Sequence, residues 1–291
     1  MKLGIGTVQF GFDYGISNHE GRTSPEEVAR ILKVAAEHGI RIIDTAAFYG
    51  ASEETLGQVL PPEYSFSIVT KTPGFSKESI TVDDAQLLED TFHQSLSRLG
   101  QSSIYALLAH HADDLLSSNG HLLVEKMQAI KQRGLAKKIG ISVYTAQQID
   151  QVLDKFPVDI VQLPINVLDQ RLLLSGHLSK LKRLNIEVHA RSVFLQGLLL
   201  MDPDTLPIYF DSVKDHLKDY HDFILKKGLS PVQASLGFVI GLNEVDTVIC
   251  GVNNHQQLEE ICSSIGPLPT EDFARFAIAD KAVLNPSEWR V

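Results

Sequence analysis

The sequence predicts a (β/α)8 or TIM barrel, in which eight parallel strands alternate with helices and the active site lies at the carboxyl-terminal mouth. Three observations favour this fold. Short runs rich in β-branched residues alternate with helical patterns, as in repeated βα units. Eight such runs are present, and several stop on a charged or polar residue. No shift in composition marks a boundary, so we expect one domain over residues 1–291, with residues 266–291 as a tail that packs on it.

The strands are predicted from apolar runs that end at polar or glycine-rich segments. The run that contains Ile42 and Ile43 stops on Asp44, and the next run stops on Lys71. The fourth run ends before two histidines, and the sixth carries Gln162 near its end. The expected strands cover residues 3–10, 40–44, 66–71, 104–109, 138–142, 159–163, 186–190 and 247–250.

The helices are predicted from their caps and from apolar periodicity. Ser24, followed by Pro25 and by Glu27 three positions on, is a strong helix start, and Gly39 ends that helix. The segment 83–99 has apolar residues at helical spacing, namely Leu87, Leu88, Phe92, Leu96 and Leu99. The other expected helices cover residues 52–60, 122–133, a segment that closes at 152–156, 172–184, 212–227, 231–242 and 256–263.

Composition excludes several classes of function. The formal charge is 26 minus 36, or −10, and it is spread along the chain, which disfavours nucleic-acid or anionic-membrane binding. Cys250 and Cys262 form neither a disulfide framework nor a metal-binding spacing, so we expect no metal and a reducing compartment. No signal-peptide pattern and no run of roughly 18 apolar residues is present. We therefore expect a soluble, cytoplasmic protein.

The strand ends supply candidate catalytic residues. An acid such as Asp44 at the end of a buried strand is costly without a cation, and Lys71 ends the neighbouring strand. Taken alone, the aspartate is more often a helix cap and the lysine a solvated loop residue, but in a barrel both converge at the mouth. Tyr49 follows Asp44 in the loop, where a nearby ammonium group stabilises a phenolate and makes the hydroxyl a better proton donor. Its alternative role is that of a surface aromatic residue.

The two histidines after the fourth strand need to be distinguished. Adjacent residues of a strand face opposite ways, so we expect only one of His110 and His111 to point into the mouth. Both faces of this strand are apolar. Periodicity therefore leaves the choice between the two histidines open.

A set of motifs resembles the aldo-keto reductase family across residues 2–261. These motifs are GTVQFG, IDTAAFYGASEETLG, IVTK, LLAHH, IGIS, VQLPIN and GVNNHQQLEE, in the family's order and spacing. The resemblance implies a catalytic tetrad of Asp44, Tyr49, Lys71 and His110, with His110 preferred because it follows the strand directly. It also implies hydride transfer from a reduced nicotinamide to a carbonyl carbon, with Tyr49 as proton donor.

The same resemblance implies a nicotinamide dinucleotide as cofactor, although no GxGxxG turn is present. NADPH is the family expectation. NADH is the alternative, because the loop 251–257 has no Lys or Arg for a 2′-phosphate and His255 is its only candidate cation. Arg191 stands where many members stack an aromatic ring on the nicotinamide. Its guanidinium is expected either to stack on the nicotinamide or to contact the substrate or a phosphate. The other expected cofactor-binding residues are Ser142 and Gln162 at the carboxamide, Ser192 and Gly197 towards the pyrophosphate, and Gly251, Gln257 and Glu260 at the adenosine end.

The substrate is expected to be a small-molecule carbonyl compound. Its contacts are expected from residues 9–18, Phe48 and Phe75, whereas Trp289 is expected to pack against the barrel. The opening GTVQFGFDYGISN is similar to a bacterial subgroup connected with sugar and surface-polysaccharide metabolism, which suggests a sugar-like aldehyde or ketone. A monomer or a small homo-oligomer is expected.

Two other functions compete with carbonyl reduction. The first is a non-catalytic, redox-sensing module that binds the nicotinamide cofactor with the same fold, as potassium-channel β subunits do. The second is an unrelated barrel, such as a lyase or isomerase with Lys71 as a Schiff-base amine. The absence of a phosphate-binding glycine pattern argues against the second.

Overall fold

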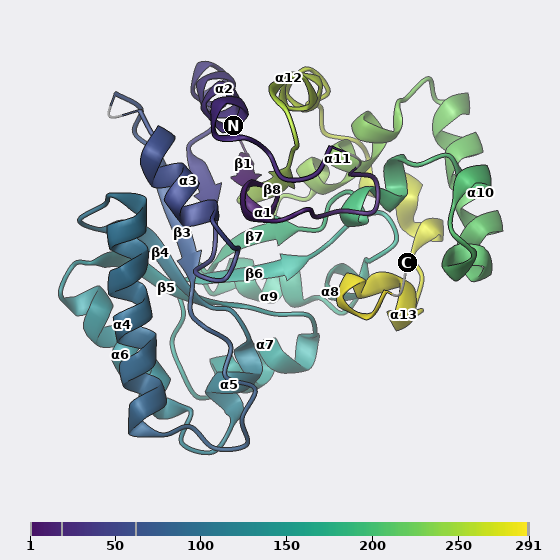
Figure 1. Cartoon of the computed structure of the whole chain (residues 1–291). Helices are drawn as coiled ribbons and strands as arrows, with labels where there is room; N and C mark the ends of the chain where they lie inside the picture. The colour runs from purple at the N-terminus through teal and green to yellow at the C-terminus, as the bar shows by residue number, and fades with distance from the viewer. Residues whose placement is uncertain (1, 19, 62, 290–291) are drawn as a thin grey trace.

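The computed structural model of this chain describes residues 2–18, 20–61 and 63–289. Its strands form a closed parallel barrel in chain order, in which β8 pairs with β1, and the helices lie outside this ring (Figure 1). The (β/α)8 barrel predicted from the sequence is therefore confirmed. The strands are β1 (Leu3–Gly6), β2 (Ile42–Asp44), β3 (Ser67–Lys71), β4 (Ile104–Ala109), β5 (Ala136–Ser142), β6 (Ile160–Pro164), β7 (Glu187–Arg191) and β8 (Thr247–Gly251).

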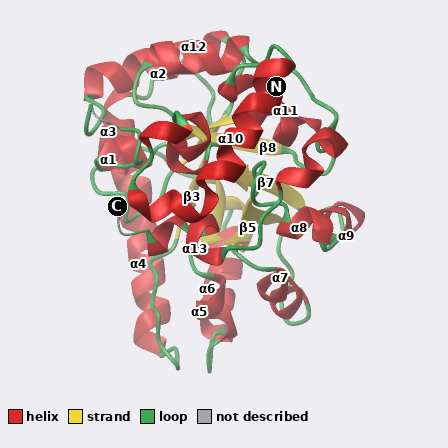
Figure 2. Ribbon diagram, turned by 90° about the vertical axis from the view of Figure 1, so that its right-hand side faces the viewer, coloured by secondary structure: helices red, strands yellow, loops and turns green. Residues whose placement is uncertain are grey.

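Several of the helices begin at a residue whose side chain caps the first turn. The Ser24 hydroxyl accepts a hydrogen bond from the Glu27 N–H at the start of α2, and Thr81 and Asp84 form a reciprocal capping box at the start of α4. The main helices are α2 (Pro25–Glu37), α3 (Ser52–Val59), α4 (Val82–Leu99), α6 (His121–Gln132), α7 (Ala146–Leu153), α9 (His177–Arg183), α10 (Asp211–Lys226), α11 (Pro231–Gly241) and α12 (His255–Ser263). Figure 2 shows the strands enclosed by these helices.

Three details differ from the sequence-based prediction. The first strand ends at Gly6 and not at residue 10, because the chain turns into the short helix α1 (Val8–Gly11), which buries Phe10 completely. The predicted helix 172–184 is split into α8 (Arg171–Leu174) and α9, with Gly176 at a φ of 76° between them. Leu87 is 51% exposed, so it does not belong to the buried face of α4.

The core has two parts that together place the strand ends. A small apolar layer fills the inside of the barrel, formed by Val69, Ala106, Leu108 and Ile160. A much larger layer fills the space between strands and helices. Gly6 pairs with Asp44 on one side and with Gly251 on the other, so the carboxyl ends of β2 and β8 lie level with the end of β1, on either side of it.

The carboxyl-terminal segment lies against the barrel. The Ile278 N–H donates to the Leu168 carbonyl at 3.0 Å, and the Trp289 indole N–H donates to the Val283 carbonyl at 3.1 Å. The Trp289 ring packs edge-to-face on Phe210 with 4.9 Å between ring centres. This segment contains η4 (Thr270–Phe276), α13 (Lys281–Leu284) and η5 (Pro286–Glu288). Among the residues described, no helix is long and apolar enough to cross a membrane.

Candidate active site

A cavity of about 460 Å³ opens at the carboxyl ends of the strands. The last residues of six strands line it, namely Gly6, Asp44, Lys71, Ser142, Arg191 and Gly251. The twelve residues that the sequence analysis assigned to catalysis and cofactor binding all line this one cavity, although they come from distant parts of the chain: Asp44, Tyr49, Lys71, His110, Ser142, Gln162, Arg191, Ser192, Gly197, Gly251, Gln257 and Glu260.

A buried ion pair forms the floor of the cavity. The Lys71 ammonium donates to Asp44 Oδ2 at 2.7 Å and to the Thr45 carbonyl at 2.8 Å. The side chains of Lys71 and Asp44 are only 1% and 7% exposed. Gln162 Nε2 donates to the other carboxylate oxygen of Asp44 at 2.7 Å, so both carboxylate oxygens are satisfied. Burial alone would lower the pKa of Lys71, but the charge of Asp44 raises it above its ordinary value, which keeps the amine protonated.

Tyr49 faces this ion pair from the loop after β2. The Lys71 Nζ atom lies 5.0 Å from the centre of the Tyr49 ring, and the Tyr49 and His110 rings meet edge-to-face at 5.8 Å. A close backbone contact sets the position of this loop, since a Cβ atom at Gly11 would lie 1.6 Å from the Tyr49 carbonyl oxygen. Only glycine at position 11 permits this approach.

His110 and His111 both line the cavity, so the expectation that only one of them faces it is wrong. The strand β4 ends at Ala109, and the alternation of a strand no longer applies to the two residues after it. Their rings lie 5.2 Å apart. Burial lowers the pKa of the His110 imidazole to about 3, and the Lys71 ammonium adds to this effect. His110 is therefore a neutral hydrogen-bonding group near pH 7.

Arg191 is held in place by two contacts that the sequence did not predict. Its guanidinium carbon lies 4.2 Å from the centre of the Tyr144 ring, and its Nη2 donates to the Val143 carbonyl at 3.1 Å. Tyr144 also lines the cavity and follows the end of β5 by two residues. Its position just beyond a strand end was the available signal for a role in the site.

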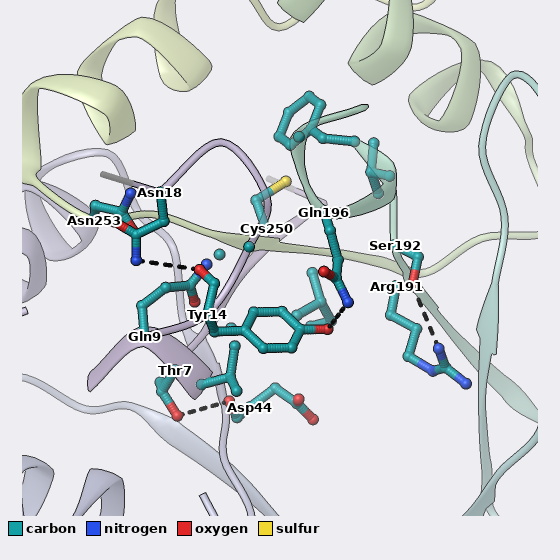
Figure 3. Close-up of a pocket in the computed structure, with 18 of the residues that line it drawn as sticks. Thr7, Gln9, Tyr14, Asn18, Asp44, Arg191, Ser192, Gln196, Cys250 and Asn253 are labelled. Atoms are coloured by element: carbon teal, nitrogen blue, oxygen red, sulfur yellow. Dashed lines mark hydrogen bonds between the residues drawn. The ribbon is translucent and has the colours of Figure 1, made fainter. Parts of the chain in front are cut away.

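The loop after β1 reaches the loop after β7 across the cavity. Figure 3 shows the Tyr14 hydroxyl directed at Gln196, whose Nε2 donates to it at 3.0 Å. Ser192, Leu195 and Gln196 have positive φ values of 60°, 46° and 54°, and Gly197 has a φ of 95°. Tyr14 falls in the expected contact segment 9–18, whereas no pattern pointed to Gln196.

Three aromatic residues that were considered for the substrate do not line the cavity. Phe48 is 60% exposed beside Tyr49. Phe75 lies in a loop whose backbone N–H donates to Asp114 Oδ2 at 2.9 Å. Trp289 packs on Phe210, as expected of a packing residue. The expectation that Phe48 and Phe75 contact the substrate therefore finds no support in the lining of this cavity.

The sequence model of the Aldo/keto reductase family matches residues 2–281 of this chain. The chain belongs to the aldo/keto reductase family. Its relatives include L-galactose dehydrogenase of Arabidopsis thaliana, which is 24% identical over 91% of this chain and 86% of that protein. D-arabinose 1-dehydrogenase of Saccharomyces cerevisiae is 26% identical, over 44% of this chain and 41% of that protein. The family assignment makes this chain an oxidoreductase of the class that acts on carbonyl compounds with nicotinamide cofactors.

Solved structures of other family members have the same fold. An aldo-keto reductase of Bacillus halodurans in its holo form superimposes with a TM-score of 0.78 and 20% identity, covering 96% of this chain and 94% of that chain. A glycerol dehydrogenase of Gluconobacter oxydans superimposes with a TM-score of 0.74 and 20% identity, covering 100% of this chain and 93% of that chain. At this identity the likeness establishes the barrel fold.

Proposed function

We propose that this aldo-keto reductase reduces an aldehyde or ketone to an alcohol by hydride transfer from NADPH or NADH, with Tyr49 as the proton donor. The observation that supports this best is the fixed position of the Lys71 ammonium group next to Tyr49. Two of its three N–H groups bind Asp44 and the Thr45 carbonyl, while Nζ lies over the Tyr49 ring. A cation fixed in this way stabilises negative charge on the tyrosine oxygen.

The extent and the lining of the cavity support a dinucleotide as the cofactor. It extends without interruption from the Tyr49 end to the start of α12, where Gln257 and Glu260 line it. It also contains two side-chain amides, those of Gln9 and Asn253, whose oxygen atoms are buried and have no partner among the residues described. Unpartnered buried polar groups are costly, so they favour a polar ligand in this part of the cavity. In our proposal Ser142 and Gln162 hold the carboxamide, Ser192 and Gly197 lie near the pyrophosphate, and Gly251, Gln257 and Glu260 hold the adenosine end.

The chain's own residues would then act as follows. Ser142 and Gln162 would hold the nicotinamide, which when bound in its reduced form would supply hydride to the carbonyl carbon, so that negative charge would grow on the carbonyl oxygen. Tyr49 donates its hydroxyl proton to that oxygen, and the Lys71 ammonium stabilises the resulting phenolate. Asp44 holds Lys71 in position through the 2.7 Å contact. Neutral His110 donates a hydrogen bond that orients the carbonyl group before the transfer.

We propose a sugar-like aldehyde or ketone as the substrate. Two of the relatives are named for reactions of galactose and arabinose. The cavity near Tyr49 is bordered by groups that suit hydroxyl groups, including Arg191, Tyr144 and Gln196. A panel of carbonyl compounds tests this proposal. Turnover of sugar-like compounds no better than that of simple aldehydes would count against it.

The experiment for the reaction itself is the variant Tyr49→Phe, which removes only the hydroxyl group. We expect the turnover rate, followed through the absorbance of the reduced cofactor, to fall by about 10²–10⁴-fold, while cofactor binding by calorimetry stays within about threefold. Phe48→Ala is the matched control, because Phe48 is the neighbouring aromatic residue but lies outside the cavity. Full activity of Tyr49→Phe would show that another group donates the proton. Tight cofactor binding without any turnover in the wild type would favour a redox-sensing module.

A further inference from the structure

We propose that the dinucleotide of this enzyme is NAD(H), and that the α12 end of its cavity rejects the 2′-phosphate of NADP(H). This inference rests on the proposed function, because it assumes that the adenosine part of the cofactor binds between β8 and α12. Three independent features of the chain lead to it. They are the placement of the cationic side chains, the occupation of the α12 amino terminus, and the polar groups that remain free.

Among the residues that the structure describes, no lysine or arginine lines the α12 end of the cavity. Among the described residues that line the cavity as a whole, Lys71 and Arg191 are the ones with these side chains. Lys71 is engaged with Asp44, and Arg191 is stacked on Tyr144 at the end of β7. Figure 3 shows Arg191 on the side of Tyr14 away from Gln9 and Asn253. A phosphate dianion at the adenosine ribose would therefore find no lysine or arginine partner among the described residues of the cavity wall.

The amino terminus of α12 is already occupied by a carboxylate. Glu27 Oε1, from α2, accepts the His255 backbone N–H at 2.7 Å and lies 2.6 Å from His255 Nδ1. The side chain of Asn254 accepts the Gln257 N–H at 2.9 Å. These N–H groups are the ones that a phosphate at a helix start would use. The side chain of His255, the candidate cation of this loop, is therefore already hydrogen-bonded to Glu27.

The Glu27 carboxylate is ionised near pH 7 and forms an ion pair with Arg30, with 2.6 Å between Arg30 Nη2 and Glu27 Oε2. Burial alone would raise the pKa of Glu27, but hydrogen bonds from His255 and Arg30 lower it below its ordinary value. A second carboxylate, Glu260, lines the cavity itself. The carboxylates of Glu27 and Glu260 consequently oppose a further dianion, the Arg30 guanidinium offsets part of this repulsion, and the repulsion decreases with added salt.

The polar groups that remain free suit a ribose with two hydroxyl groups. The amides of Gln9 and Asn253 each offer one donor side and one acceptor side, whichever way each amide is turned. A hydroxyl group both donates and accepts, so neutral amides satisfy it, and the Glu260 carboxylate accepts from a hydroxyl as well. In Rossmann folds, too, a carboxylate that binds the ribose 2′-hydroxyl group accompanies NAD and an arginine accommodates the 2′-phosphate of NADP.

Calorimetric titration of the full-length wild-type chain with NAD⁺ and with NADP⁺ tests this inference directly, without any turnover. We expect NAD⁺ to bind at least about tenfold more tightly at low salt, with a smaller ratio at high salt. Equal or tighter binding of NADP⁺ would overturn the inference and leave the proposed reduction intact. If neither dinucleotide bound, the proposed function would fail, and this inference would fail with it.

The variant Glu27→Gln isolates the role of the carboxylate. It keeps the size of the side chain and removes one negative charge, so we expect the Kd for NADP⁺ to fall by at least about threefold and that for NAD⁺ to stay unchanged. Glu37→Gln is the matched control, since it removes the same charge from the other end of α2, where the side chain is 58% exposed. The NAD⁺ titration shows that each variant is folded. An unchanged Kd for NADP⁺ in Glu27→Gln would contradict the electrostatic explanation.

Discussion

Removal of the Asp44 carboxylate tests the central electrostatic feature of the site. In the variant Asp44→Ala the Lys71 ammonium stays buried and keeps only the Thr45 carbonyl as a partner. Removing one member of a buried ion pair costs about 3–5 kcal/mol, because the remaining charge is uncompensated. Gln162 Nε2 loses its acceptor in the same variant. Because this hydrogen bond belongs to the same network, the free energy lost with it is already part of the loss of about 3–5 kcal/mol and is not added to it.

The assay is urea unfolding, with the free energy of unfolding compared between variants. With an m-value of about 3 kcal/mol/M, the expected loss moves the midpoint by about 1–1.7 M. The variant Lys71→Met completes a double-mutant cycle. We expect the double variant to lose about 2–3 kcal/mol less than the sum of the single losses, because it leaves no unpaired buried charge.

The control for this cycle is the exposed pair of Lys33 and Glu37 on α2, which lie 3.9 Å apart with 66% and 58% exposure. Glu37→Gln should change the free energy of unfolding by less than about 1 kcal/mol. Two results together would show that Asp44 and Lys71 behave as a solvated ion pair. Asp44→Ala would lower the free energy of unfolding by less than about 1 kcal/mol, and the losses in Asp44→Ala and Lys71→Met would simply add up in the double variant. The buried cation would then be rejected as the support for Tyr49.

Three further predictions follow from the described contacts. Because the pKa of His110 is lowered to about 3, its imidazole signals in NMR should not titrate between pH 5 and 8; a midpoint near 6.5 would contradict its neutral role. Burial alone would raise the pKa of Glu187, but hydrogen bonds from His189 and Lys138 lower it from 4.5 to about 2. Its contribution to stability is thus present above about pH 4.5 and lost as the pH falls towards 2, and unfolding of Glu187→Gln should lack this part of the pH dependence. Gly197→Ala places a Cβ atom 2.0 Å from Ser17 Oγ and should weaken dinucleotide binding at least about tenfold. The control is Gly39→Ala, where φ is also positive but no atom lies within 4 Å of the added Cβ atom. This control should lose only about 1 kcal/mol of stability and bind the dinucleotide unchanged.

The strand ends could be predicted from the sequence for a physical reason. An apolar run must stop where a parallel strand leaves the core, so a charged residue at that point marks the mouth of the barrel. Asp44 and Lys71 were found in this way. The turn after Gly6 could not be predicted, because the alternating residues Val8 and Phe10 suit a strand as well as a short helical turn.

Polar contacts between residues far apart in the chain could not be predicted from the sequence either. The hydrogen bond between Tyr14 and Gln196 joins residues 182 positions apart, and that between Glu27 and His255 joins residues 228 positions apart. Neither contact produces a periodic pattern, since each side chain lies in a loop or at a helix end. The absence of Lys and Arg from residues 251–257 was visible in the sequence, but its meaning depends on the carboxylate that α2 brings to that loop.

The charges at the Tyr49 end of the cavity connect two properties that otherwise look unrelated. Asp44 and Lys71 neutralise one another, which leaves the Arg191 guanidinium as the excess charge near the mouth. The positive charges of Lys71 and Arg191 add to burial in lowering the pKa of His110. The same positive field would stabilise the negative charge that grows on a carbonyl oxygen when the carbonyl carbon receives hydride. A protonated imidazole would add a second excess positive charge to this confined space, so the field that favours the proposed reaction also keeps His110 neutral, in agreement with Tyr49 as the proposed proton donor.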